Sequence, residues 1–185
     1  MAWIQELEEK EASGELKEVY NGLIKKRGRL SNIMKIHSLR PDVMQKHMDL
    51  YISICFKKSG VSREDRELLA VVVSLMNDCS YCVHHHAEAL KFFWKDEQRV
   101  ENFIKDPQSV TLSDKQQMLV EYAMKLTNTP SKMIKSDVEG LRNCGYSDKD
   151  ILDIALCISY FNFVNRIVLG LGVEFSEEEM EGYKY

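Results

Sequence analysis

Two cysteines and a histidine in residues 62–86 have the types and the spacing needed for thiol redox chemistry. Cys79 and Cys82 form a C-x-x-C pair, and His86 follows four residues after the second cysteine. On one α-helix, at about 100° per residue, the three side chains fall within roughly 60° to 80° of one another and share a face. The thiolate is the reactive form of cysteine, and a neighbouring imidazole can accept the thiol proton.

A carboxylate can join this group if the chain folds back. Glu67 lies twelve residues before Cys79, a separation of about 18 Å along one straight helix. Asn77 and Asp78 are residues that favour turns and helix N-caps. A turn there would put Glu67 and His86 at similar height on two facing helices. The sequence therefore predicts a pocket with a dithiol, an imidazole and a carboxylate.

Zinc binding is the other use of such a cluster. The C-x-x-C pair and one histidine of the run His84–His86 could supply ligands. Their spacing on a helix is too tight for a closed tetrahedral site, and the sequence shows no evident fourth ligand. We therefore predict no metal and no cofactor. Within the run, we expect His86 to share the cysteine face and the other two histidines to point elsewhere.

Composition narrows the class of protein. The chain has 185 residues, of which 44% are hydrophobic and 29% charged, as in an ordinary globular protein. We expect one domain over 1–185, with an N-terminal helical arm (1–30) and an acidic, partly disordered tail (174–185). The net charge of −4 and the scattered basic residues give no basis for nucleic-acid binding.

Membrane and secreted classes are also disfavoured. No apolar run reaches the ~18 residues of a membrane span, and the acidic N-terminus is unlike a signal peptide. The five cysteines include one close pair, which argues against a secreted disulfide framework. We expect a cytoplasmic protein, where a C-x-x-C pair is redox-active or binds metal more often than it is structural.

Apolar residues recur at helical spacing along the whole chain, and no segment alternates with a period of two, so we predict an all-α fold. Capping residues and glycines mark the helix ends. The expected helices cover Glu6 to about Lys26 with a break near Ser13, Ser31 or Asn32 to Leu39, Pro41 to a stop at Gly60, a segment after Ser62, Cys79 to about Trp94, Glu97 to Lys105, Ser113 to Leu126, Ser136 to Gly145, and Ile151 to Leu169.

Several other residues are candidates for lining the site, because they lie between the cysteines or are polar residues in an apolar helix: Ser80, Tyr81, Asn162, Asn165 and Arg166. Buried amide and guanidinium groups need partners, so the block 161–166 is expected to line either the active site or a subunit interface. The cysteines outside the pair have no partner in sequence, and we expect core or surface thiols at Cys55, Cys144 and Cys157.

The spacing from Glu67 through the C-x-x-C pair to His86 resembles the catalytic signature of the AhpD alkylhydroperoxidases, within the carboxymuconolactone decarboxylase-like superfamily. Three segments resemble its peroxidase-related branch: SREDRELLAVVVSLMNDCSYCVHHHAEAL, LSDKQQMLVEYAMKLTNTP and LRNCGYSDKDILDIALCISYFNFVNRIVLGLGVEF. The resemblance covers about residues 32–175. AhpD has a histidine immediately before the second cysteine, where this chain has Tyr81, and this departure affects the AhpD-type proton relay.

The resemblance implies an AhpD-like helical fold built around a C-x-x-C helix hairpin, and a peroxidase or disulfide oxidoreductase without haem or flavin. It implies that Cys82 becomes a sulfenic acid and that Cys79 resolves it into a disulfide, with His86 and Glu67 as the proton relay. Helix position alone would favour Cys79 as the more activated thiol. The implied partners are a hydroperoxide or disulfide substrate and a dithiol reductant.

A homo-oligomer, either a trimer or a hexamer made of dimers, is expected from the family. The apolar faces of the helices at 41–56 and 151–169 also offer more hydrophobic surface than one small domain covers easily. Two other functions remain open. A lactone decarboxylase of the same superfamily would need no redox dithiol, so the C-x-x-C pair argues against it. A non-enzymatic stress or interaction protein would use the fold as a scaffold.

Overall fold

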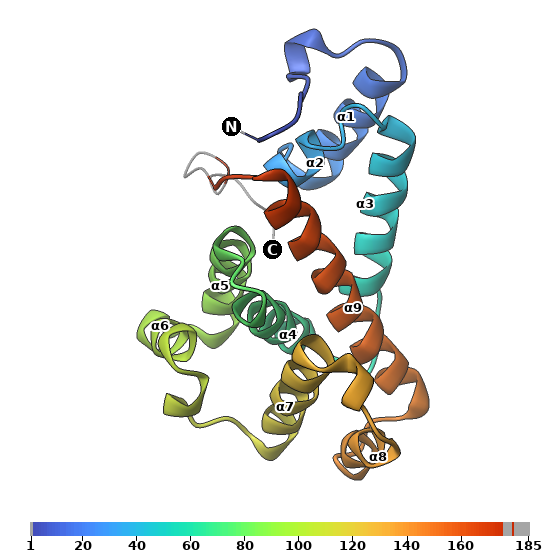
Figure 1. Ribbon diagram of the computed structural model, residues 1–185. Coiled ribbons are helices and arrows are strands. Elements are labelled where there is room, and N and C mark those ends of the chain that lie inside the picture. Colours follow the sequence, from blue (N-terminus) through green and yellow to red (C-terminus); the bar gives the residue numbers. More distant parts are fainter. Residues whose placement is uncertain (1, 176–178, 180–185) are drawn as a thin grey trace. The chain divides into compact units, whose positions relative to one another are not determined.

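The computed structural model describes residues 2–175 and residue 179, and every regular element in this part of the chain is a helix (Figure 1). The chain divides into two compact units: Met1–Ser53 with Arg166–Tyr185, and Ile54–Asn165. The prediction of an all-α fold is confirmed. Most residues of the acidic tail, for which partial disorder was expected, lie outside the described residues. The single domain over 1–185 stays a prediction.

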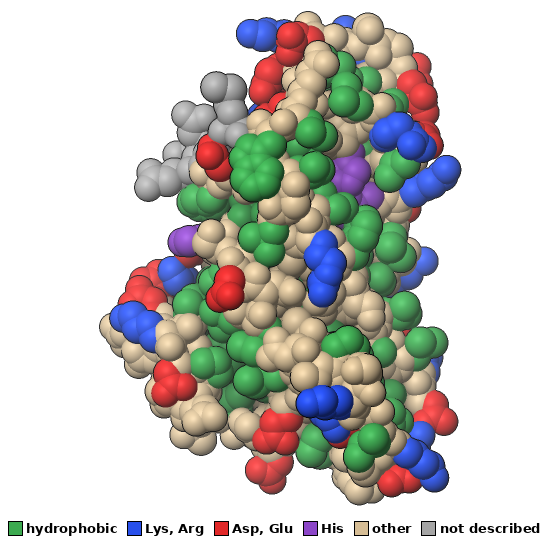
Figure 2. All heavy atoms as spheres, viewed as in Figure 1, with side chains coloured by type: hydrophobic (Ala, Val, Ile, Leu, Met, Phe, Trp, Pro, Cys, Tyr) green, Lys and Arg blue, Asp and Glu red, His purple; other side chains and the backbone are tan. Residues whose placement is uncertain are grey.

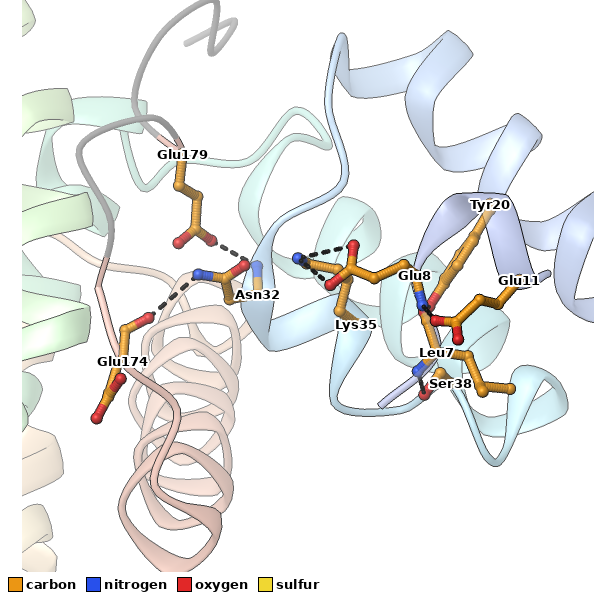
Figure 3. Close-up of polar contacts among 9 residues, drawn as sticks. All are labelled: Leu7, Glu8, Glu11, Tyr20, Asn32, Lys35, Ser38, Glu174 and Glu179. Carbon is orange, nitrogen blue, oxygen red and sulfur yellow. Dashed lines mark hydrogen bonds and ion pairs between the residues drawn. The ribbon is translucent and has the colours of Figure 1, made fainter. Parts of the chain in front are cut away.

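The first unit contains a short 3₁₀ helix (Glu9–Glu11), α1 (Gly14–Arg27), α2 (Asn32–Lys35), most of α3 (Pro41–Cys55) and the end of α9 (Asp148–Leu171). Side chains tie its first segment to these helices (Figure 3). The hydroxyl of Tyr20 donates to the carbonyl of Leu7 at 2.7 Å, and the amide of Leu7 donates to Oγ of Ser38 at 2.9 Å. The expected helix from Glu6 therefore begins only at Gly14, because Ser13 is extended and residues 9–11 form a separate turn.

The chain after α9 is held to the start of α2 (Figure 3). The carboxylate of Glu179 accepts a hydrogen bond from the amide of Asn32 at 2.6 Å, and the Asn32 side chain donates to the carbonyl of Glu174 at 3.1 Å.

Gly172 has a φ of +65° and lies against Trp3 so closely that a Cβ atom would overlap the indole. Glycine is therefore required at this position.

The second unit contains the segments with the candidate chemistry (Figure 1). Its elements are α4 (Arg63–Met76), α5 (Ser80–Trp94), α6 (Glu97–Lys105), a 3₁₀ helix (Pro107–Ser109), α7 (Asp114–Asn128), a 3₁₀ helix (Pro130–Lys132), α8 (Lys135–Asn143) and the first part of α9. Every residue of α4 from Arg66 to Ser74 is buried, as expected for a central helix packed on all sides.

Side-chain caps define most helix starts in this unit. The hydroxyl of Ser62 accepts from the amide of Asp65 at 3.0 Å, and Ser113 caps α7 in the same way. The expected start of α8 at Ser136 is wrong. The helix begins at Lys135, because Asp137 reaches back and accepts from the amide of Ile134 at 2.8 Å. Ser136 therefore lies in the first turn rather than at the cap.

Helix α9 is long and apolar enough to cross a membrane by length and composition alone. A buried core helix passes the same test, and 44% of the apolar window of α9 is buried inside the chain. Ile154, Cys157 and Ile158 have no exposed area. Apolar side chains also reach the surface among charged ones on the face drawn in Figure 2. On α9 the exposed ones include Leu152, Leu156 and Phe163.

Candidate active site

The turn between α4 and α5 places the first cysteine at a helix N-terminus. Asp78 has a φ of +53°, a left-handed conformation that reverses the chain, and the amide of Cys79 donates to the carbonyl of Ser74 at 2.9 Å. Cys79 is the N-cap residue of α5, which begins at Ser80. A helix N-terminus carries partial positive charge and favours an anion such as a thiolate.

Glu67 and His86 meet across the two helices. Nδ1 of His86 lies 2.7 Å from Oε2 of Glu67. A carboxylate accepts hydrogen bonds, so Nδ1 carries the proton and Nε2 is left as the basic atom of the ring. The Glu67 side chain is 1% exposed and that of His86 is 13% exposed. The ring of Phe161 contacts the imidazole edge-on, with centroids 4.5 Å apart.

The two thiols of the C-x-x-C pair are hydrogen-bonded and buried. Cys79 has no exposed area and Cys82 is 2% exposed. The hydrogen bond from the Cys82 thiol is the main cause that lowers the pKa of Cys79. Burial acts in the opposite direction, and the Cys82 amide and the charge of His85 lower the pKa further. The balance of these causes favours the thiolate form of Cys79.

The other histidines of the run differ from each other. His84 is exposed, and its Nδ1 donates to the carbonyl of Ser80 at 2.7 Å, as expected for a residue away from the cysteines. His85 is half-buried. Its Nδ1 donates to the carbonyl of Tyr81 at 3.0 Å, and the ring centroids of His85 and Tyr81 lie 4.4 Å apart. The charge of His85 is the smallest of the causes that lower the pKa of Cys79.

Comparison with known proteins places this geometry in a family. The model of the carboxymuconolactone decarboxylase family matches residues 41–106, a range that includes the cysteine pair, Glu67 and His86. The uncharacterized protein YdfG of Bacillus subtilis is 25% identical over 143 residues, which cover 77% of this chain and 96% of YdfG.

Comparison with solved structures agrees with the family-model match. An uncharacterized peroxidase-related protein from Silicibacter is 26% identical and superimposes with a TM-score of 0.82, covering 92% of this chain and 89% of that one. The family-model match and the peroxidase-related neighbour together support placing the chain in the AhpD/carboxymuconolactone decarboxylase superfamily. An AhpD-core protein from Ralstonia eutropha (22% identity, TM-score 0.85, 96% and 94% covered) and the debrominase Bmp8 (20%, 0.75, 94% and 92%) share the fold.

Two asparagines of α9 hold the α4–α5 turn. The amide nitrogen of Asn77 donates to Oδ1 of Asn162 at 3.1 Å and to Oδ1 of Asn165 at 3.2 Å. Asn162 in turn donates to Thr127 on α7 at 3.0 Å, and Asn165 donates to Ser74 at 3.3 Å. These asparagines therefore brace the turn that carries Cys79, and they do so as part of a partly buried polar network.

The remaining candidate site-lining residues divide between buried and exposed. Tyr81 is 4% exposed and contacts His85, whereas Ser80 is exposed. Arg166 is also exposed, and it belongs to the first unit rather than to the unit that contains the cysteine pair.

A cavity of about 530 Å³ lies beside the cysteine pair on another face of α5. Ser80, Val83 and Ala87 line it from α5, together with the ends of α4 and α6. Among the described residues, those that line this cavity do not include Cys79 or Cys82. The cavity therefore flanks the turn but does not open onto the thiols.

Cys55 and Cys157 form a second pair of thiols that the sequence did not indicate. Both have no exposed area, and Sγ of Cys157 lies 3.9 Å from the carbonyl of Arg66. Hydrogen bonding with Cys55, followed by burial, raises the pKa of Cys157 well above its ordinary value. A thiol held in this neutral state is a poor nucleophile, which agrees with a core role.

Among the described residues, no group of three or more His, Cys, Asp and Glu side chains is arranged to hold a metal ion. Sequence reasoning missed three residues beside the site: Arg63, whose Nη2 lies 2.6 Å from Oε1 of Glu67, Asn77 as a bridge to α9, and His85. A signal existed for Arg63, because an arginine four residues before a glutamate is a standard ion-pair spacing on a helix.

Proposed function

We propose that this chain is a thiol-dependent peroxidase in which the Cys79–Cys82 pair reduces a hydroperoxide. One observation carries the proposal: two hydrogen-bonded thiols with a lowered pKa at Cys79 lie in one unit with a buried Glu67–His86 pair. The pair of thiols supplies two electrons and ends as a disulfide. The imidazole, with its basic Nε2, supplies a site for the proton that must leave first.

His86 accepts one proton from the dithiol, which leaves one negative charge and one proton shared between the two sulfurs. Cys82 attacks the terminal peroxide oxygen, the O–O bond breaks, and the alkoxide leaves with the proton held by Cys79. The Cys79 thiolate then attacks the Cys82 sulfenic acid and displaces hydroxide, which takes its proton from His86. The sum is two thiols and one hydroperoxide giving one disulfide, one alcohol and one water.

The order of the cysteines rests on the family resemblance. The lowered pKa of Cys79 favours the resting charge on that sulfur, so attack by Cys82 requires the shared proton to move from Cys82 to Cys79 first. The hydrogen bond between the thiols makes this transfer short. If Cys79 attacks instead, the same steps apply with the two sulfurs exchanged.

A dithiol must reduce the resulting disulfide to close the cycle, since thiol–disulfide exchange needs an attacking thiolate. We propose that an external dithiol does this, that no haem, flavin or metal takes part, and that the protein works in the cytoplasm as a homo-oligomer. A disulfide substrate would enter the same cycle in reverse at the exchange step.

Thiol counting after peroxide treatment tests the proposal. The reduced protein is exposed to one equivalent of hydrogen peroxide, and free thiols are measured after denaturation. We expect two of the five thiols to be lost in the natural chain and no disulfide to form in Cys79→Ser or Cys82→Ser. A lactone decarboxylase or a non-enzymatic scaffold would keep all five thiols, and that result would end the peroxidase proposal.

A further inference from the structure

Arg63 contacts the buried carboxylate on the side opposite to the histidine. Nη2 of Arg63 lies 2.6 Å from Oε1 of Glu67, and Nδ1 of His86 lies 2.7 Å from Oε2. Each carboxylate oxygen therefore has its own partner. Arg63 belongs to the same helix as Glu67, one turn earlier, and its side chain is 20% exposed.

The guanidinium of Arg63 is itself held in place. Nη1 donates to the carbonyl of Cys55 at 3.0 Å, and the ring of Phe56 lies under the guanidinium carbon at 3.9 Å. A planar guanidinium fixed by a carbonyl and an aromatic ring presents its remaining N–H groups in one direction. That direction is toward Oε1 of Glu67, so the carboxylate is fixed with its other oxygen toward His86.

The charge of Arg63 matters as much as its position. A carboxylate that is 1% exposed loses most of its hydration, and an ion in this state needs a compensating charge. With Arg63 present, the ionised carboxylate is compensated before His86 takes up a proton. Without Arg63, the buried negative charge would attract a proton to the pair. That proton would go to His86, because the imidazole is the more basic and the more exposed of the two groups.

We propose that Arg63 is a positioning residue that orients Glu67 and keeps the Glu67–His86 pair free to accept the thiol proton. The inference rests on the proposed function, in which His86 must be unprotonated when the dithiol gives up its first proton. Arg63 thus sets the pH range over which the pair works.

Other groups that face the pair do not replace Arg63. Arg66, on the same helix, directs Nη1 to the carbonyls of Cys55 and Lys57 at 3.0 and 2.9 Å. From α9, Cys157 faces Glu67 as a neutral thiol, since hydrogen bonding with Cys55 and burial, with a further contribution from the charge of Glu67, raise its pKa. From α5, His85 acts on Cys79, and Cys82 is the group whose proton is to be accepted.

The test uses Arg63→Met, which removes the charge at similar length, and Arg63→Lys, which keeps it. Arg142→Met is the matched control, because Arg142 makes an ion pair with Asp148 at 2.7 Å on the surface. Nuclear magnetic resonance follows the ring protons of the five histidines against pH, with His86→Ala identifying the signal of His86. In parallel, the rate of hydrogen peroxide consumption is measured over the same pH range.

In Arg63→Met we expect the titration midpoint of His86 to rise by about one pH unit or more, since nearby opposite charges shift such midpoints by one to three units. The peroxide rate should shift to higher pH by the same amount. Arg63→Lys should stay near the natural protein, and Arg142→Met should match it. If Arg63→Met does not fold, Arg63→Gln gives the same comparison with a neutral side chain.

An unchanged His86 midpoint in the neutral variants would overturn the role of Arg63, whatever the peroxide rates. An equal shift in Arg63→Lys would also overturn it, because charge would then not be the cause. A raised midpoint in a protein that consumes no peroxide would support the control of the pair by Arg63 and refute the peroxidase proposal. The two failures are therefore distinguishable.

Discussion

The carboxylate of Glu67 on α4 lies 2.7 Å from the imidazole of His86 on α5, although nineteen residues separate them in sequence. The reversal at Asp78 brings them together, and the asparagines of α9 hold that reversal in place. The contact buries the carboxylate almost completely and fixes the imidazole with Nε2 as its basic atom. Each part of this arrangement can be removed separately.

Removing the base should slow the reaction in a pH-dependent way. In His86→Ala we expect the rate of hydrogen peroxide consumption at neutral pH to fall by about 10²- to 10⁴-fold, the usual loss for a general base. The rate should recover partly at alkaline pH, where hydroxide can deprotonate the thiol without help. Glu67→Gln should show the same change with a smaller amplitude. Rates equal to those of the natural chain in His86→Ala would exclude the proposed relay.

The two cysteine variants should stop at different points. Cys82→Ser should consume no peroxide, because an alcohol does not ionise near neutral pH. Cys79→Ser should consume about one equivalent per chain and stop at a sulfenic acid, since no resolving thiol remains. Trapping with dimedone followed by mass spectrometry locates the product. A sulfenic acid on Cys79 in Cys82→Ser, with none on Cys82 in Cys79→Ser, would reverse the order, and the lowered pKa of Cys79 makes that outcome informative.

Local sequence signals predicted most of the helices and the meeting of Glu67 with His86. The turn residues Asn77 and Asp78 and the cap at Ser62 fixed where α4 begins and ends. Long-range contacts were not predictable in the same way. The bonds from Asn77 to Asn162 and Asn165, and the pairing of Cys55 with Cys157, join segments whose spacing follows no local rule.

Some errors came from reading one helix in isolation. The helical angle gave the direction of His85 but not its packing on Tyr81, which depends on the neighbouring side chains. The apolar stripe of α3 was expected to supply free surface for association. Met44, Met48 and Tyr51 are instead buried within the chain.

Burial of both thiols should make the protein selective for small oxidants. Cys79 has no exposed area and Cys82 is 2% exposed, so an oxidant must fit through a narrow opening or wait for local movement. We expect hydrogen peroxide to oxidise the pair faster than cumene hydroperoxide when both are compared by stopped-flow loss of thiols. Free cysteine, treated in parallel, corrects for the intrinsic reactivity of the two peroxides. A corrected preference for the bulky peroxide would show that the thiols are open in solution.

A histidine pair in the first unit should make stability depend on pH. Nδ1 of His47 lies 3.3 Å from Nε2 of His37, and burial, with the charge of His37 as a second cause, lowers the pKa of His47 to about 4. The unfolded chain therefore binds more protons than the folded chain between about pH 6.5 and pH 4. Stability should fall as the pH is lowered through this range, by about 3 kcal/mol.

Urea unfolding at several pH values measures this slope. His47→Gln should reduce the loss of the free energy of unfolding between pH 7 and pH 4. His84→Gln is the control, because His84 is exposed and its replacement should leave the slope unchanged. The same slope in His47→Gln as in the natural chain would show that other groups cause the acid sensitivity.

Association of chains should depend on the exposed apolar face of α9. Leu152, Leu156 and Phe163 are 58%, 41% and 45% exposed, and their spacing of four and seven residues places them on one side of the helix. An apolar row of this kind is more typical of an interface than of a free surface. We expect light scattering at micromolar concentration to give three or six times the chain mass of 21.5 kDa.

Leu156→Glu should lower that mass, because association would bury a charge. Ile134→Glu is the control, since Ile134 is 60% exposed at the N-cap of α8, away from the α9 row, and should leave the mass unchanged. A monomer in the natural chain would remove the predicted oligomer, and an equal effect of both variants would show that α9 is not the interface.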